Sequence, residues 1–126
     1  MNFEIEAVRR VRGGKRKGAI TVKKLNYEEF DEVIDDKAET CLVFFSRQSC
    51  SVCKRVHPKL EALEAEYPNY SFYLVDVEEQ PNRLVQFHLK GVPQTIFFVD
   101  GQMKRVITGN AETDDFIDFI EEYGIV

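Results

Sequence analysis

Apolar and polar residues follow two different periods along the chain, and each change of period predicts where a strand or a helix begins. Short runs rich in β-branched and aromatic residues predict strands, whereas apolar residues three or four positions apart predict helices. We expect strands at 20–25, 41–45, 71–77, 95–99 and 103–108. We expect helices that begin after Asn26, near Cys50, at Pro81 and at a Thr113 cap. From residue 41 onward the order is βαβαββα, which predicts an α/β fold with a mixed central β-sheet flanked by helices.

Turn and capping residues support several of these boundaries. Asn26 followed by Glu29 is a capping-box pattern, which predicts the start of the first helix. Pro68 predicts the end of the helix that begins near Cys50. The Asp100-Gly101 pair stands between two apolar runs, and this pattern predicts a two-residue hairpin turn.

Each expected helix has one apolar side that we predict to be buried. In the first two helices these residues are Phe30, Val33 and Ile34, then Val56, Leu60 and Leu63. In the last two they are Leu84, Val85 and Phe87, then Phe116, Ile117, Ile120 and Tyr123. Gly91 suits the end of the third helix. The strand at 41–45 is apolar throughout, which is typical of a strand buried on both faces.

Length and composition narrow the class of protein. The chain has 126 residues, of which 44% are hydrophobic and 12% aromatic, as expected for a single globular domain. It has no apolar run long enough for a signal peptide or a membrane span, so we expect a cytoplasmic protein. Three cysteines are too few for a secreted disulfide scaffold.

Charge divides the chain into two parts. Residues 1–18 contain six basic and two acidic residues, a net of +4, whereas residues 19–126 contain 11 basic and 20 acidic residues, a net of −9. The acidic body argues against nucleic acid as the main partner. We predict one domain at 19–126, preceded at 1–18 by a basic arm or an extra hairpin strand. The arm is either simply solvated or in contact with an anionic partner, RNA or the acidic body itself.

Two cysteines three positions apart carry the candidate chemistry. Cys50 and Cys53 follow the strand at 41–45 and open the next helix. A cysteine at a helix N-terminus meets unpaired backbone N–H groups and the positive end of the helix dipole, both of which stabilise a thiolate. Cys53 lies one turn further in and is sheltered. The spacing therefore predicts an attacking thiol at Cys50 and a resolving thiol at Cys53.

Together with four other features, this pair resembles the thioredoxin family over residues 20–126. The features are a lysine after CxxC, Pro58, the Gly91-Val92-Pro93 segment before the strand TIFFV, and the glycines Gly101 and Gly109. The resemblance implies a thioredoxin-like fold and thiol–disulfide exchange. It also implies a cis bond before Pro93, where Val92 and Pro93 would hold an extended substrate chain. The alternative for Pro93 is a tight turn before a strand.

Several positions depart from the family pattern. Ser49 replaces the usual tryptophan, Ser51-Val52 replaces Gly-Pro, Phe44 replaces a buried aspartate, and Leu74 replaces a lysine near it. A buried thiol among apolar neighbours has a raised pKa. We therefore expect Cys53 to attack slowly near neutral pH unless another base serves.

His57 is the candidate base, and three cations surround the cysteine pair. His57 lies four residues after Cys53 on the same helix face, and an imidazole can accept a thiol proton. The alternative is a partly exposed surface histidine. Arg47, Lys54 and Arg55 would favour a thiolate at Cys50 and an acidic substrate, or would simply face solvent.

A metal site is the competing interpretation of the cysteines. Cys50, Cys53 and His57 follow a C-x2-C-x3-H spacing, and Cys41 could add a fourth zinc ligand. Structural zinc sites usually draw their ligands from two loops, whereas three of these residues would share one helix. We expect no metal. Cys41 fits a small core residue, with a redox-sensing or cross-linking thiol as the alternative.

These observations favour a protein-disulfide reductase. We expect no bound cofactor, a redox-active Cys50–Cys53 disulfide, and electrons from NADPH through a thioredoxin-reductase-like enzyme. The partners would be protein disulfides, with no membrane. A thioredoxin-fold module that binds a partner or senses redox state with little turnover is the alternative. Retention of both cysteines favours the first, and loss of the aromatic residue, the carboxylate and Gly-Pro favours the second.

Overall fold

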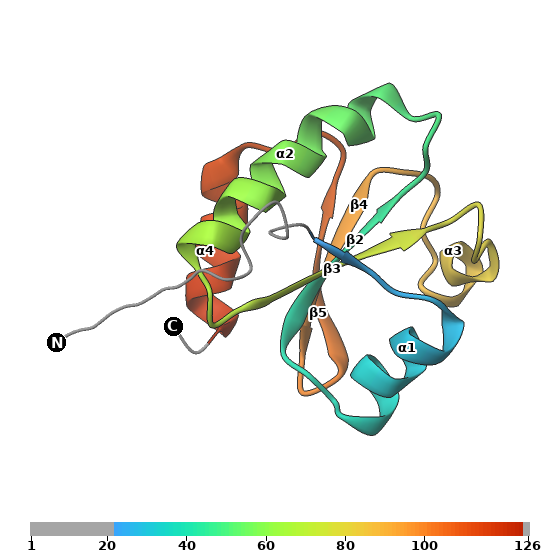
Figure 1. Cartoon of the computed structure of the whole chain (residues 1–126), viewed down its shortest axis with the longest axis horizontal. Coiled ribbons are helices and arrows are strands. Elements are labelled where there is room, and N and C mark those ends of the chain that lie inside the picture. Colours follow the sequence, from blue (N-terminus) through green and yellow to red (C-terminus); the bar gives the residue numbers. More distant parts are fainter. Residues whose placement is uncertain (1–21, 125–126) are drawn as a thin grey trace, which may run out of the picture.

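A five-stranded mixed sheet forms the centre of the computed structural model, which describes residues 22–124 (Figure 1). The strands are β1 (Lys23–Lys24), β2 (Cys41–Ser46), β3 (Ser71–Asp76), β4 (Gln94–Val99) and β5 (Gln102–Thr108). Their order is β1-β3-β2-β4-β5. β1, β3 and β2 run parallel, whereas β4 is antiparallel to β2, and β5 to β4. The predicted strand at 20–25 is described only from residue 22, and the predicted arm or hairpin at 1–18 lies outside the described residues.

Helices cover both faces of this sheet. They are α1 (Tyr27–Asp31), which continues as a π-helical turn η2 (Glu32–Asp36), α2 (Ser51–Glu66), α3 (Asn82–Gln86) and α4 (Thr113–Tyr123). In Figure 1, α2 and α4 lie on one face, and α1 and α3 lie on the other. The predicted α/β architecture with a mixed sheet flanked by helices is confirmed.

β2 is the central strand, and its side chains alternate between two hydrophobic cores. Leu42 and Phe44 point into the core shared with α2 and α4. Cys41, Val43 and Phe45 belong to the core on the other face, with α1 and η2. All six residues of β2 are buried, as the continuous apolar run predicts. The carboxyl end of this strand is therefore a rigid base for the loop that leads to the two cysteines.

The predicted start of the first helix and the predicted hairpin turn are confirmed, and the other predicted boundaries, apart from the start of β1 and the end of α3, lie within about one residue of those observed. The Asn26 side chain accepts the Glu29 N–H, and Glu29 accepts the Asn26 N–H, which completes the capping box. Asp100 and Gly101 have φ values of 52° and 77°, as a two-residue hairpin turn requires. The boundary of α4 was predicted one residue late, because Glu112 is the cap and Thr113 is the first helical residue.

The third helix differs from the prediction in length and in its buried side. α3 has five residues and ends well before Gly91. Leu84 and Phe87 pack against the core, but Val85 is 76% exposed, so the predicted stripe is wrong at that position. A helix of little more than one turn presents only a narrow side to the sheet. Arg83 occupies part of that side and is 5% exposed.

Arg83 is buried because each part of its guanidinium has a partner. The group lies 4.1 Å from the centre of the Phe30 ring. It donates hydrogen bonds to Gln80 Oε1 and Gln86 Oε1, and it pairs with Asp31 Oδ1 at 3.1 Å. A buried cation is tolerated when it is paired and hydrogen-bonded in this way. Arg83 thus joins α3 to α1, a role that hydrophobic periodicity does not reveal.

Candidate active site

Cys50 caps the N-terminus of α2, as the sequence predicts. Its backbone is extended, with φ −88° and ψ 111°, and its Sγ accepts the Cys53 N–H at 3.1 Å. The sulfur therefore takes the place of the oxygen that usually caps a helix.

The two thiols have different environments. Cys50 is 9% exposed and Cys53 is 3% exposed, and neither is in a disulfide. Burial is the largest cause that raises the pKa of Cys53, to about 11, and the hydrogen bond with Cys50 is the second. The backbone and the charge of Arg47 act in the opposite direction and lower this pKa. Cys50 is thus the more exposed of the two residues. Cys53 stays protonated near neutral pH until something accepts its proton.

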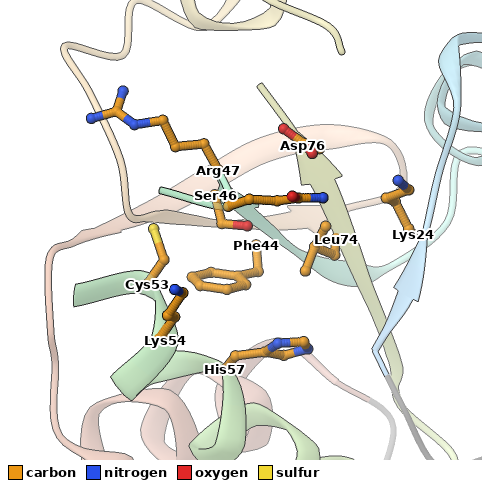
Figure 2. Close-up of a pocket in the computed structure, with 10 residues that line it drawn as sticks. Lys24, Phe44, Ser46, Arg47, Cys53, Lys54, His57, Leu74 and Asp76 are labelled. Atoms are coloured by element: carbon orange, nitrogen blue, oxygen red, sulfur yellow. The ribbon is translucent and has the colours of Figure 1, made fainter. Parts of the chain in front are cut away.

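A cavity of about 230 Å³ opens beside Cys53 (Figure 2). Its lining comes from α2, the strand ends and the loop between them: Lys24, Phe44, Ser46, Arg47, Gln48, Cys53, Lys54, His57, Leu74 and Asp76. Phe44 and Leu74 are cross-strand partners in the parallel β2–β3 pair. They are the two residues that stand where the family pattern has a carboxylate and a lysine. Their apolar side chains explain part of the desolvation of Cys53.

Polar side chains follow these two apolar ones on the same strands. Ser46 and Asp76 are also cross-strand partners, and they are 8% and 6% exposed. The Asp76 Oδ1 accepts the Glu78 N–H at 2.9 Å. The sequence reasoning missed Asp76, although it lies two residues after Leu74 and strand residues two apart share a face.

His57 reaches the same cavity but is not bonded to Cys53. Its ring centre lies 6.0 Å from that of Phe44, and Figure 2 shows the Phe44 side chain between Cys53 and His57. The His57 Nε2 is buried without a hydrogen bond among residues 22–124 and lies 3.8 Å from Glu61 Oε2. His57 therefore faces its neighbour on α2 more directly than it faces the thiol.

The Val92–Pro93 peptide bond is cis and lies at the same edge of the sheet. Phe45 pairs with Gln94, so Pro93 is next to the carboxyl end of β2, where the cysteine loop starts. The Pro93 carbonyl accepts the Gly109 N–H at 3.0 Å. The loop before β4 and the loop after β5 are thus joined beside the cysteine loop.

Three cations surround the start of α2. Arg47, Lys54 and Arg55 are exposed, and within residues 22–124 none of them forms an ion pair. The first turns of α2 have no acidic residue, and Glu66 stands at the end of the helix. This arrangement opposes the helix dipole, which favours acidic residues at the N-terminus and basic residues at the C-terminus. The three cations therefore do not complement the dipole of α2.

The alternative zinc ligands are not brought together. Cys41 packs in the core with α1, on the face of the sheet opposite to Cys50 and Cys53. Residues 22–124 contain no group of three or more His, Cys, Asp or Glu side chains that could hold a metal ion. Burial raises the pKa of the Cys41 thiol strongly, as expected for a core residue. Within the same residues, no helix is long and apolar enough to cross a membrane.

Two thiols lie at the start of a helix that follows the central strand of a mixed sheet, next to a cis-proline loop. This arrangement defines the class of proteins that exchange thiols and disulfides. The chain belongs to the thioredoxin family, whose model matches residues 21–122. It is 32% identical to a thioredoxin of Chlamydia trachomatis over 82 residues, which are 65% of this chain and 80% of that one. It is 26% identical to a chloroplastic M-type thioredoxin of Spinacia oleracea over 81% of this chain and 57% of that one.

Comparison with solved structures agrees. A mutant thioredoxin from Halobacterium salinarum has a TM-score of 0.74 and 26% identity, over 85% of this chain and 94% of that one. The thioredoxin-like fold is therefore confirmed. Family membership identifies the protein, in general terms, as a thiol–disulfide oxidoreductase.

Proposed function

We propose that this protein reduces protein disulfides through Cys50 and Cys53. The observation that carries the proposal is the Cys50 Sγ at the cap of α2, 3.1 Å from the Cys53 nitrogen. The Cys50 thiolate attacks one sulfur of a substrate disulfide, and the other substrate sulfur leaves as a thiolate. Cys53 then loses its proton and attacks Cys50, which releases the second substrate thiolate and leaves a Cys50–Cys53 disulfide. The substrate gains two electrons and the dithiol loses them.

Val92 and Pro93 hold the substrate in this proposal. They stand next to the carboxyl end of β2, where the cysteine loop starts, and an extended substrate chain would pair with their backbone there. Arg47, Lys54 and Arg55 attract segments with acidic residues next to the disulfide, because unpaired cations steer oppositely charged partners. His57 is the base that the sequence suggests, and its position beside the cavity supports only an indirect contact with Cys53.

The electron source that fits this scheme is NADPH, acting through a thioredoxin-reductase-like enzyme. No cofactor is bound in the proposal, because the Cys50–Cys53 pair itself carries the two electrons. A cytoplasmic location, in which the dithiol is kept reduced, supports the reducing direction. In the proposal, residues 1–18 are a basic arm or an extra hairpin strand that precedes the domain at 19–126 in the sequence.

One observation favours a second candidate function. Phe44 and Leu74 leave Cys53 in apolar surroundings, with a pKa of about 11, so the resolving attack can be too slow for turnover. The protein would then bind a partner or sense redox state through Cys50.

Two measurements together distinguish these functions. The first is insulin reduction with NADPH and a thioredoxin reductase, and the second is titration of the Cys50–Cys53 couple in glutathione buffers. Turnover with a reducing couple supports the reductase. A couple that cycles in buffer without turnover supports the sensor or binding module.

A further inference from the structure

The resolving step needs a proton acceptor near Cys53, and the cavity restricts the candidates. Charged and titratable groups reach it from every element packed around Cys53: Lys24 from β1, Arg47 from the cysteine loop, Lys54 and His57 from α2, and Asp76 from β3. The Cys50 thiol accepts the Cys53 N–H and is not among the residues that line the cavity. The lysines and the arginine are cations at neutral pH and cannot accept a proton. His57 and Asp76 remain.

Asp76 is held in a position that leaves one oxygen available. Its Oδ1 accepts the Glu78 N–H, whereas no residue within 22–124 donates a hydrogen bond to Oδ2. Its partner across the β2–β3 pair is Ser46, a hydroxyl that can both donate and accept. Asp76 from β3 and Cys53 from α2 both line the cavity, on different sides of it in Figure 2.

The cavity is large enough to hold water between these groups, and part of its lining is polar. Its volume of about 230 Å³ is far above the roughly 15 Å³ that one water molecule needs. Ser46, Asp76 and Cys53 supply the two to four polar partners that such a water requires. His57 offers a poorer route, because the Phe44 ring lies between it and Cys53 and its Nε2 is nearer to Glu61.

We propose that Asp76 acts as the base of the resolving step by accepting the Cys53 proton through water in this cavity. The inference rests on the proposed function, because it concerns the second half of the same exchange. The proposed base, Asp76, lies on β3, two positions after Leu74. The buried aspartate of the family pattern would lie on β2, at the position of Phe44.

The proposed step balances in protons and electrons. A cavity water passes a proton to the Asp76 carboxylate while it takes the proton of the Cys53 thiol. The Cys53 sulfur attacks the Cys50 sulfur of the mixed disulfide, so the Cys50–Cys53 bond forms and the bond from Cys50 to the substrate breaks. The substrate sulfur leaves with the electron pair of that bond and is protonated from solvent. Asp76 then returns its proton to water.

The test follows the two sulfur-exchange steps separately by stopped flow with dithiodipyridine. Attack by Cys50 releases the first thiopyridone, and attack by Cys53 on the mixed disulfide releases the second. Asp76→Asn keeps the Oδ1 acceptor for the Glu78 N–H and the size of the side chain. Glu79→Gln is the matched control, because it removes one negative charge from a residue that pairs with Lys24 and does not line the cavity.

We expect Asp76→Asn to slow the second release at least about ten-fold at pH 7, as loss of a general base does, and to leave the first within about two-fold. The difference should fade near pH 11, where Cys53 ionises unaided. Asp76→Glu should recover part of the rate, and Glu79→Gln should change little. The direction of the rate change in Asp76→Asn is decisive. If Asp76 acted only through its negative charge, removing that charge would make the Cys53 thiol ionise more easily and would speed the second release.

Four results would overturn the inference. They are an unchanged or faster second release in Asp76→Asn, an equal slowing of both releases, a slowing that persists at pH 11, and a slowing in His57→Gln with none in Asp76→Asn. A wild-type protein with no second release contradicts the proposed function itself. The two failures are therefore distinguishable in one experiment.

Discussion

Exchanging each site cysteine for serine should produce two different proteins. Cys53→Ser keeps the more exposed cysteine at the cap of α2 and removes the resolving one, so we expect it to accumulate mixed disulfides with substrate. Cys50→Ser keeps only the sheltered thiol, which is 3% exposed, and we expect it to form none. Cys41 remains in both variants and is fully buried on the opposite face of the sheet.

The size of the difference follows from the ionisation of Cys53. Its pKa of about 11 is 2 units above its ordinary value of 9.0, so its thiolate fraction at pH 7 is about 100-fold below that of an ordinary thiol. A thiolate of higher pKa is a better nucleophile, and with a Brønsted coefficient of about 0.45 this recovers about eight-fold. The net effect is a reaction about twelve-fold slower than that of an ordinary exposed thiol, before burial slows it further.

Iodoacetamide labelling followed by mass spectrometry measures this rate in the Cys50→Ser variant. A single cysteine placed at exposed Ser49 in a protein without Cys50 and Cys53 supplies the reference thiol. The Cys50→Ser rate should rise about ten-fold for each pH unit from 7 to 10. Trapping is measured by non-reducing electrophoresis after incubation with reduced and reoxidised insulin.

Equal trapping by the two variants would refute the division of labour between Cys50 and Cys53. Labelling of Cys53 at the reference rate at pH 7 would refute the ionisation argument, because burial, the largest cause of the raised pKa, is still present in this variant.

Two further predictions concern stability. Gly101→Ala should destabilise the fold more than Gly109→Ala by roughly 1–3 kcal/mol in urea denaturation. Both glycines have a positive φ, 77° and 80°, but only at Gly101 would a Cβ overlap a neighbour, at 2.4 Å from the Ile34 carbonyl oxygen. Equal losses of stability in the two variants would contradict this prediction. Because the folded pKa of Cys53 is raised, its contribution to stability is complete below pH 9 and is lost as the pH rises through 11, by at most about 3 kcal/mol. Reduced wild type should lose this increment between pH 9 and 11 relative to Cys53→Ala, and parallel curves would count against it.

The sequence predicts the sheet and the cysteine geometry well because these depend on local rules. The apolar run of β2, the Asn26 capping box and the Asp100-Gly101 turn each act over a few residues, and all are confirmed. Cys50 at a helix cap is also local, since a strand, a short loop and a helix fix its place.

The errors arise where tertiary contacts decide. Val85 has the spacing of a core residue, but α3 is too short to bury it, and Arg83 takes the inner side through contacts with residues about 52 to 56 positions away. Asp76 was missed for a similar reason. Asp76 lines the same cavity as Cys53 through the register between β2 and β3, and its only signal in the sequence is the spacing of two residues from Leu74.

Charged and polar groups in places that do not favour stability cluster at one edge of the sheet. Unpaired cations stand at the positive end of α2, the His57 Nε2 is buried without a hydrogen bond among the described residues, and Asp76 is buried at a strand end with one oxygen available. Arg83, by contrast, is a buried charge whose partners are in place. Natural sequences contain such placements mainly at functional sites. The Tyr70 hydroxyl, which is buried without a partner in the described structure, is the exception at the opposite edge. The clustering around Cys53 therefore points to the resolving step as the part of the exchange in which this chain differs from the family pattern.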